Sequence, residues 1–108
     1  MVYELKTYHA HPGRHAQLLR RFHEVTLPVF ARLGIEVVGC WTRPDDPDAL
    51  VYMTRHASDE ARRAAWAAFG ADAEWLAAKA ASEAGGPLLL RQESVALQGA
   101  PFWPGSAS

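Results

Sequence analysis

Four segments of the chain predict strands, either because hydrophobic and polar residues alternate in them or because they are short and rich in β-branched and aromatic residues. The segments are residues 2–9, 35–41, 50–56 and 88–97. Strand side chains point alternately to the two faces of a sheet, so every second residue shares a face. In the first segment one face carries two opposite charges between an aliphatic and an aromatic residue, and the other face is more apolar.

Two longer segments repeat their apolar residues at helical spacing. The first covers residues 14–33, and Pro28 inside it predicts a kink or a division, because proline cannot donate the backbone hydrogen bond. Gly34 is a typical end signal for this helix. The second segment, residues 59–84, is rich in alanine, the strongest helix former.

Polar residues predict how the second helical segment begins and divides. Ser58 is a good N-cap, since its hydroxyl can accept from a backbone N–H of the first turn. Gly70 weakens the helix, and Asp72 can cap a second helix after it. We therefore expect a long helical region that is interrupted at residues 70–72.

The resulting order β-α-β-β-α-β predicts an α+β, ferredoxin-like fold. In this fold two helical segments cover one face of a four-stranded antiparallel sheet. We expect a single domain over residues 1–98, followed by a C-terminal tail over residues 99–108.

The first strand raises the question of which of its faces is covered. We expect strands one and four to be neighbours, with Glu4 and Lys6 on the helix-free face beside Arg91 and Glu93. That face would be too apolar to suit water, so a second copy of the sheet is expected to cover it and form a homodimer. The alternative is a monomer with a solvated sheet face, which antiparallel sheets tolerate.

Composition excludes several classes of protein. Eleven basic and twelve acidic side chains give a net charge of -1, which disfavours nucleic-acid binding. The single cysteine fits a reducing cytoplasm, and no apolar stretch approaches the roughly 20 residues of a membrane span. The start of the chain has no signal-peptide pattern, so a cytoplasmic location is expected.

Cofactor and metal motifs are missing from the sequence. There is no glycine-rich phosphate loop and no nucleophile elbow. His9 and His11 could be two metal ligands, but two imidazoles make a poor site without a third ligand. We expect them to be ordinary loop or surface histidines, and we expect no bound metal or cofactor.

Several short motifs together resemble the NIPSNAP family over nearly the whole chain. They are the opening Tyr-Glu-Leu-basic-x-Tyr, Gly-x-Trp at Gly39 and Trp41, Arg-x-x-x-Trp at Arg62 and Trp66, and Asp-x-x-Trp at Asp72 and Trp75. The resemblance implies a dimeric α+β barrel, in which two sheets pack face to face. Two departures are Lys6, where arginine is common, and a tail without the family's usual Asp-Phe-Ser-Pro.

The resemblance implies less about chemistry than about fold. NIPSNAP proteins are mostly of unassigned function, and members in higher organisms resemble mitochondrial or vesicle-associated adaptors. The wider superfamily includes cofactor-free monooxygenases, cyclases, lyases and dehalogenases that act on small molecules. The two hypotheses are therefore a cofactor-independent enzyme acting on a small aromatic or polyketide-like molecule and a non-catalytic dimeric binding or adaptor module.

Proton transfer in a small-molecule pocket would need ionisable groups near aromatic walls. The candidate catalytic residues are Glu4, His9 and His56. The candidate substrate-binding residues are Tyr8, Trp41, Tyr52, Arg55 and Trp66. For the aromatic residues on helices, packing in the core is the alternative interpretation.

The tail is polar and rich in proline and glycine, yet it contains Phe102 and Trp103. Free exposure of both rings would be unfavourable, since burying one aromatic side chain contributes on the order of 2 kcal/mol. We expect residues 101–103 to dock on their own domain or on a second copy, with residues 105–108 loose.

Overall fold

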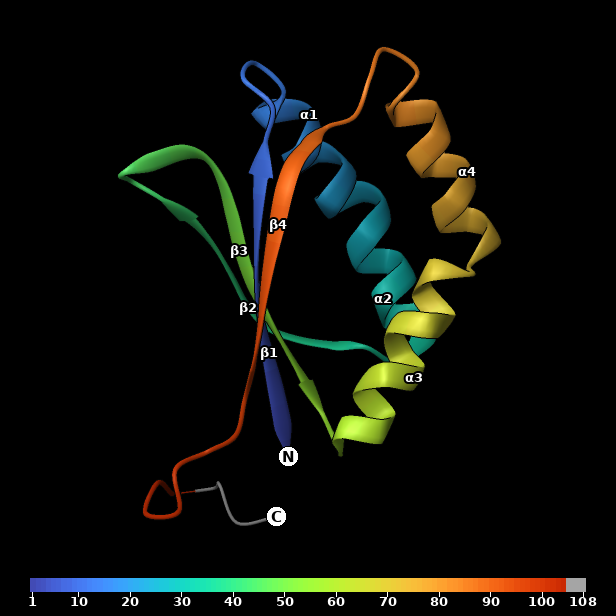
Figure 1. Cartoon of the computed structure of the whole chain (residues 1–108). Helices are drawn as coiled ribbons and strands as arrows, with labels where there is room; N and C mark the ends of the chain where they lie inside the picture. The colour runs from blue at the N-terminus through green and yellow to red at the C-terminus, as the bar shows by residue number, and fades with distance from the viewer. Residues whose placement is uncertain (105–108) are drawn as a thin grey trace.

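The computed structural model describes residues 1–104 and contains a four-stranded antiparallel sheet with all helices on one face (Figure 1). This arrangement confirms the predicted ferredoxin-like α+β fold. The sheet order is β2-β3-β1-β4, so the first and last strands are neighbours as expected. The strands are β1 (Val2–Ala10), β2 (Glu36–Arg43), β3 (Asp46–His56) and β4 (Leu89–Leu97). The helices are α1 (His15–Arg21), η1 (Phe22–Thr26), α2 (Leu27–Leu33), α3 (Asp59–Gly70) and α4 (Ala73–Ser82).

The first helical segment contains a π-helical turn, η1, which ends two residues before Pro28. The backbone N–H of Leu27 donates to the carbonyl of Phe22, five residues earlier, so this turn is wider than an α-helical one. Pro28, which has no N–H, falls in the first turn of α2, where no such donor is needed. Gly34 ends α2 with a left-handed backbone, at φ 78°.

The second helical segment is divided where its sequence predicts. The hydroxyl of Ser58 accepts from the backbone N–H of Ala61 at 3.1 Å and begins α3. The carboxylate of Asp72 accepts from the backbone N–H of Trp75 at 2.9 Å and begins α4. Side-chain caps of this kind satisfy N–H groups that have no partner inside the helix.

The core lies between the sheet and the helices. Tyr52 on β3 is fully buried at its centre, with ring centroids 4.7 Å from Phe22 and 6.0 Å from Phe30. Leu18 and Val29 complete the helical side of this cluster. Such contacts supply most of the apolar burial that holds helices on a sheet.

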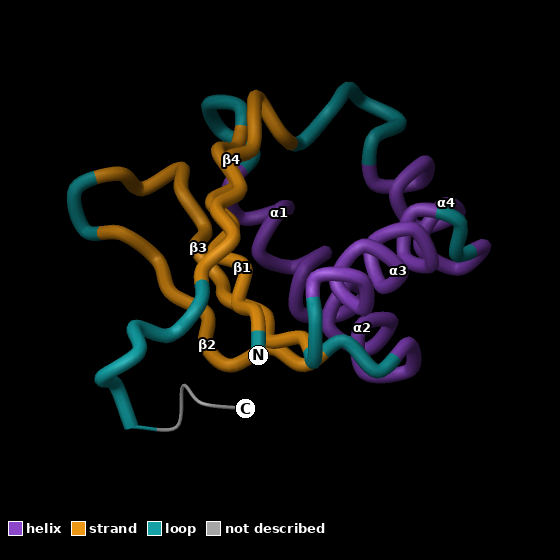
Figure 2. Tube along the Cα trace, turned by 60° about the horizontal axis from the view of Figure 1, so that its bottom comes forward, coloured by secondary structure: helices purple, strands orange, loops and turns teal. Residues whose placement is uncertain are grey.

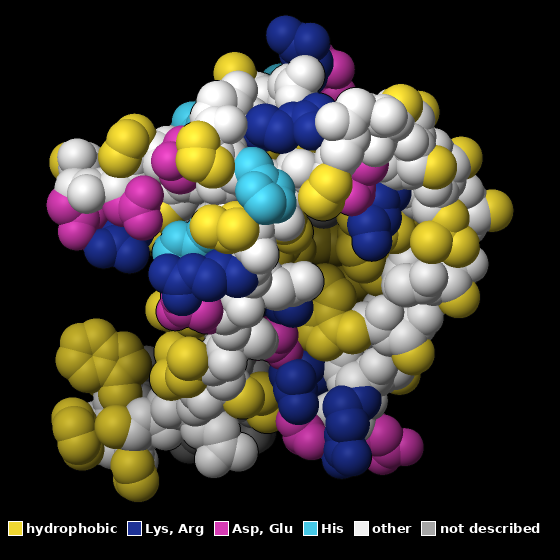
Figure 3. All heavy atoms as spheres, turned by 45° about the horizontal axis from the view of Figure 1, so that its top comes forward, with side chains coloured by type: hydrophobic (Ala, Val, Ile, Leu, Met, Phe, Trp, Pro, Cys, Tyr) yellow, Lys and Arg dark blue, Asp and Glu magenta, His cyan; other side chains and the backbone are white. Residues whose placement is uncertain are grey.

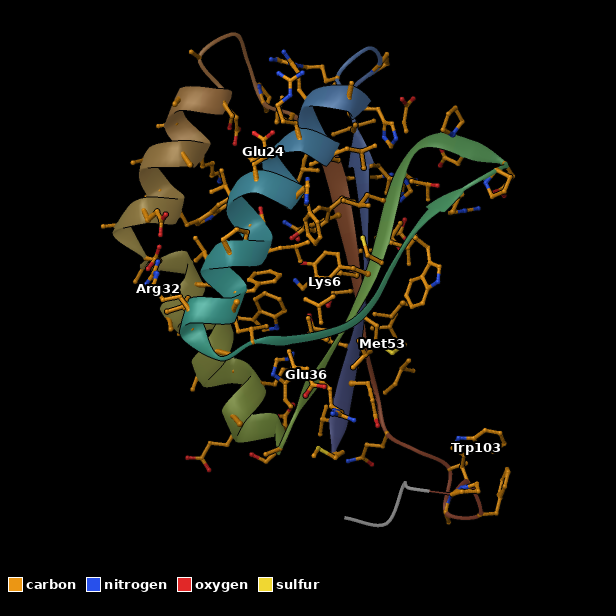
Figure 4. All side chains as sticks on the ribbon, turned by 180° about the vertical axis from the view of Figure 1, so that it is seen from behind. Lys6, Glu24, Arg32, Glu36, Met53 and Trp103 are labelled. Atoms are coloured by element: carbon orange, nitrogen blue, oxygen red, sulfur yellow. The ribbon has the colours of Figure 1, made fainter. Side chains whose placement is uncertain are left out.

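The expected orientation of β1 is wrong. Val2 and Glu4 face the helices and are 6% and 2% exposed, and Lys6 points the same way (Figure 4). Arg91 and Glu93 lie beside His9 and Thr7, on the opposite face. Glu4 can be buried because α3 supplies hydrogen-bond donors to it. The sequence of β1 alone does not predict those donors.

The outer face of the sheet, the one without helices, carries Met53 (Figure 4) and several exposed apolar side chains. The β2–β3 hairpin and the segment after β4 both project on this side of the molecule (Figure 2). Trp41, Val95 and Leu97 are 50%, 52% and 39% exposed. We call this surface the outer face below.

We expected the segment after β4 to dock on its own domain or on a second copy, and in the single chain its two aromatic side chains remain exposed. Phe102 is 85% exposed and Trp103 is 66% exposed, although Trp103 borders a shallow groove of the outer face beside Tyr3 and Met53. Docking on a second copy stays a prediction. The expectation for residues 105–108 lies outside the described residues. None of the described helices is long and apolar enough to cross a membrane.

Candidate functional site

A cavity of about 410 Å³ lies between the sheet and the helical layer. Its entrance is bounded by Lys79 of α4, by Glu83 directly after this helix, and by Leu89 and Gln92 of the edge strand β4. Figure 3 shows the hollow, with a hydrophobic floor, between these two elements. The volume is within the range of small-molecule pockets.

The walls of the cavity are aromatic. Trp66 and Phe69 come from α3, Trp75 from α4, Phe22 from η1 and Tyr8 from β1. Phe69 and Trp75 are stacked, with centroids 4.7 Å apart and planes 29° apart. Flat walls of this kind suit a planar ring, which can stack on them or meet them edge-on.

Glu4 lies beneath one wall and holds it in place. Its Oε1 accepts from the guanidinium of Arg62 at 2.7 Å and from the indole N–H of Trp66 at 2.9 Å. Its Oε2 accepts from the hydroxyl of Ser94 and lies 3.4 Å from the Lys6 ammonium. Burial raises the pKa of Glu4, but the hydrogen bonds from Ser94, Arg62 and Trp66 outweigh it and lower the pKa to about 2. Glu4 is therefore a fixed anion and not a proton acceptor at neutral pH.

Lys6 brings a positive charge to the cavity. Its ammonium nitrogen lies 4.3 Å from the centroid of the Trp66 ring, in a cation–π contact. The side chain is 14% exposed and lines the cavity. Because Glu4 contacts both Lys6 and Trp66, one buried carboxylate orients a cation and an aromatic wall together.

Arg21 is a second, more deeply buried cation at the cavity. Its side chain is 5% exposed, and its Nη1 donates to the carboxylate of Glu83 at 2.9 Å and to the hydroxyl of Ser82 at 3.1 Å. The guanidinium carbon lies 5.0 Å from the Trp75 ring. Within residues 1–104, its Nε has no hydrogen-bond partner.

Two phenols meet at the inner end of the cavity. The hydroxyl oxygens of Tyr8 and Tyr52 are 2.7 Å apart and share a hydrogen bond. Burial raises the pKa of Tyr8 and the pKa of Tyr52. Both phenols therefore keep their protons at neutral pH.

The structure brings four of the predicted site residues together. Tyr8 and Trp66 line the cavity, and Glu4 and Tyr52 contact them from behind. His56 lies near this group, with its ring 6.1 Å from that of Trp66, but it does not line the cavity. Burial lowers the pKa of His56, so its imidazole is neutral at pH 7.

Three predicted site residues lie on the outer face instead. The Nε2 of His9 is 2.9 Å from the carboxylate of Glu93. Arg55 pairs with the carboxylate of Glu36 in an exposed position. Trp41 is half exposed. None of the three lines the cavity.

Sequence reasoning missed Arg21, Glu83 and Gln92. Arginine is expected at the surface, although Leu18 and Val25 flank Arg21 at intervals of three and four residues. That spacing is the signal that could have placed it on the buried side. Glu83 and Gln92 follow helical and strand patterns typical of solvated residues, and only the packing of α4 beside β4 brings them to the cavity.

Metal-ligating side chains do not converge in the part of the chain that the structure describes. No group of three or more His, Cys, Asp or Glu side chains is close enough there to hold a metal ion. The thiol of Cys40 is free and exposed.

Solved structures of similar fold include several proteins of the same family. An uncharacterized NIPSNAP domain protein from Burkholderia xenovorans is 26% identical, with a TM-score of 0.81 over 96% of this chain and 99% of that one. A NIPSNAP family protein from Agrobacterium tumefaciens is 19% identical, with a TM-score of 0.81 over 95% and 96% of the two chains.

The fold is also shared with enzymes. SnoaB, a cofactor-independent oxygenase from Streptomyces nogalater, is 20% identical, with a TM-score of 0.66 over 95% of this chain and 96% of that one. At this identity the likeness concerns the fold alone. Among curated proteins, none matches the chain. The sequence model of the NIPSNAP family matches residues 3–104, and the chain therefore belongs to the NIPSNAP family.

Proposed function

We propose that this protein is an enzyme that binds a small aromatic or polyketide-like molecule in the cavity and removes a proton from it without a cofactor. The observation that carries the proposal is a cavity with aromatic walls that also exposes ionisable groups to its contents. The fold shared with a cofactor-independent oxygenase is consistent with this class of reaction. A proton lost from an electron-rich ring leaves an anion that can react further.

The proton acceptor we favour is Glu83 at the entrance. Its carboxylate lines the cavity, is held by Arg21 and is 21% exposed, so it can pass a proton on to water. Glu4 acts indirectly in this proposal, by fixing Lys6 and Trp66. We expect the enzyme to work in the cytoplasm, where the exposed thiol of Cys40 stays reduced.

The enzyme is proposed to be a homodimer that pairs through the outer face. Trp41, Val95 and Leu97 give this face a set of large exposed apolar side chains. Contiguous patches of this type are typical of protein–protein interfaces. Pairing would bury them and would leave the cavity, on the other side of the sheet, open to ligand.

The direct test is hydrogen exchange on candidate substrates. Hydroxylated naphthalenes and anthrones are incubated with the protein in D₂O, and loss of the acidic C–H signal is followed by NMR, with oxygen uptake measured in parallel. We expect exchange with at least one compound. Gln92→Trp, which blocks the entrance, should abolish it, and Leu76→Trp on the exposed side of α4 should not.

A non-catalytic binding or adaptor module is the second candidate. The exposed outer face and the exposed Phe102 and Trp103 favour it, since they offer a contact surface that needs no chemistry. Under this alternative no compound would exchange faster with protein than without it, and Gln92→Trp would leave the exchange rate unchanged.

A further inference from the structure

We infer that the hydroxyl of Tyr8 and the ammonium of Lys6 form an oxyanion site, so that the ligand of the cavity is a planar phenol or enol bound as its anion. This inference rests on the proposed function, because it assigns the substrate class of the same cavity. Both side chains line that cavity and come from one strand. They are two residues apart in β1, which puts them on the same face about 7 Å from each other along the strand.

The hydrogen bond between Tyr52 and Tyr8 determines whether the hydroxyl of Tyr8 is free to donate to a ligand. Tyr52 is fully buried, and in the described part of the chain its hydroxyl has Tyr8 as its one hydrogen-bond partner. If Tyr8 donated to Tyr52, the proton of Tyr52 would be buried without an acceptor, which is unfavourable. The favourable direction is donation from Tyr52 to Tyr8.

Tyr8 then has a proton to donate elsewhere. Its side chain borders the cavity, so an acceptor oxygen bound there can receive this proton. Tyr8 donates and cannot act as a base, because burial keeps its phenol protonated. Accepting a hydrogen bond from Tyr52 also makes the O–H of Tyr8 a stronger donor, as in other chains of hydrogen bonds.

The charges around the cavity favour an anion over a neutral oxygen. Glu4 is the buried carboxylate of this region and contacts two cations, Lys6 and Arg62, and Arg62 is also paired with the carboxylate of Asp59. Arg21 and Glu83 balance each other, and Lys79 lies at the entrance. The described groups therefore carry a surplus of positive charge, which one ligand anion would offset.

The chemical consequence is a lower pKa for the bound ligand. When the ligand ionises, its O–H bond breaks, the electron pair stays on the ligand oxygen, and the proton goes to Glu83 or to water. Tyr8 and Lys6 stabilise the resulting oxygen anion by hydrogen bonds from fixed positions, as in oxyanion holes. Their stabilisation acts on the anion more strongly than on the neutral phenol.

The inference can be tested with 4-nitrophenol, because its phenolate and its phenol absorb at different wavelengths. The probe is titrated with pH in the presence of excess full-length protein, and the pKa of the bound probe is compared with that of the free probe. We expect the bound pKa to be lower by one unit or more, which is a preference of about tenfold or more for the phenolate.

Variants then assign the shift to residues. Tyr8→Phe should remove most of it, whereas Tyr3→Phe, on the other face of the same strand, should leave it unchanged. Lys6→Gln should also reduce the shift, and Lys6→Arg, which keeps the charge, should restore it. Tyr52→Phe should give a smaller shift than the wild type, because Tyr52 is a positioning residue. Melting curves show whether each variant is folded. If a variant does not fold, the pKa shift of 4-nitrophenol bound to the wild-type protein still tests the oxyanion site.

The outcomes separate this inference from the proposed function. An unshifted pKa for bound 4-nitrophenol, or a full shift in Tyr8→Phe, overturns the oxyanion site and leaves a small-molecule cavity in place. If neither 4-nitrophenol nor uncharged naphthalene binds the intact protein, both proposals are wrong.

Discussion

On the side of the sheet that faces the helices, β1 presents Glu4 and Lys6, and both are buried or nearly so. On the outer face, at the same level of the sheet, β4 presents Val95 and Leu97 to solvent. In this sheet a side chain is buried where other parts of the chain contact it, whether it is polar or apolar. Glu4 receives donors from one strand and one helix, whereas the apolar residues have no covering layer in the single chain.

The comparison also shows how unequal two ion pairs can be. Glu4 and Arg62 are joined in the interior, with Glu4 2% exposed, and Glu36 and Arg55 are joined on the outer face, with exposures of 51% and 38%. Buried pairs are costly to break because the remaining partner is left without solvent, and exposed pairs contribute little. The two glutamates are therefore matched probes of the two faces.

The largest effect is expected from Glu4→Ala. It removes the acceptor of Arg62, Trp66 and Lys6 at once, so the free energy of unfolding should fall by about 3 kcal/mol. Urea denaturation measures the change. Glu36→Ala is the control, and it should cost less than about 1 kcal/mol. Equal losses in the two variants would contradict the difference between the faces.

The next effect concerns the outer face. Leu97→Glu should weaken the proposed dimer by about 2 kcal/mol, or about 30-fold in the dissociation constant, because a charge would enter an apolar contact. Sedimentation velocity on the 11.9 kDa chain measures the shift toward monomer. The wild type sedimenting as a monomer at micromolar concentration would disprove the dimer.

The dependence of the free energy of unfolding on pH tests whether the buried Glu4 carboxylate stabilises the fold. Its pKa is about 2 in the folded chain and 4.5 ordinarily, so its contribution is fully present above pH 4.5 and is lost as pH falls toward 2. Thermal melts between pH 2 and 6 should show this loss in the wild type. In Glu4→Gln the curve should be flatter over the same interval, and an identical slope would exclude Glu4 as its source.

The smallest effect is expected at the end of the chain. Phe102→Ala should change the free energy of unfolding of the monomer by less than about 0.5 kcal/mol, since the ring is 85% exposed. The measurement is made in the monomeric Leu97→Glu background. If Phe102→Ala weakens the dimer of the otherwise wild-type chain, then this ring docks on the second copy.

The elements of the fold were predictable because their signals are local. Ser58 and Asp72 begin helices by contacts with residues three positions later, and Gly34 ends one through its own backbone. The covered face of β1 was not predictable in the same way. Alternation shows which residues share a face, but the donors to Glu4 are Arg62 and Trp66, which follow it by 58 and 62 residues.

In the candidate site too, some residues could be predicted from local sequence and others depend on distant parts of the chain. Tyr8 and Trp66 could be proposed from their residue types, since aromatic side chains commonly line small-molecule pockets. Arg21 was missed because arginine is expected at the surface unless a partner is known, even where its spacing from Leu18 and Val25 indicates the buried side of the helix. Its partners Ser82 and Glu83 lie at the end of a helix more than 60 residues later in the chain.

The π-helical turn η1 has a consequence for the phase of the first helical segment. In an unbroken α-helix nine residues make about two and a half turns, so Arg21 and Phe30 would point in opposite directions. The π-helical turn holds one extra residue, which reduces the rotation between the two side chains by about 100°. They therefore point toward the same side of the helix. Both side chains are buried as a result, one at the cavity and one in the core. The one extra residue thus allows one continuous stretch of helix to supply a cation to the cavity and a ring to the core.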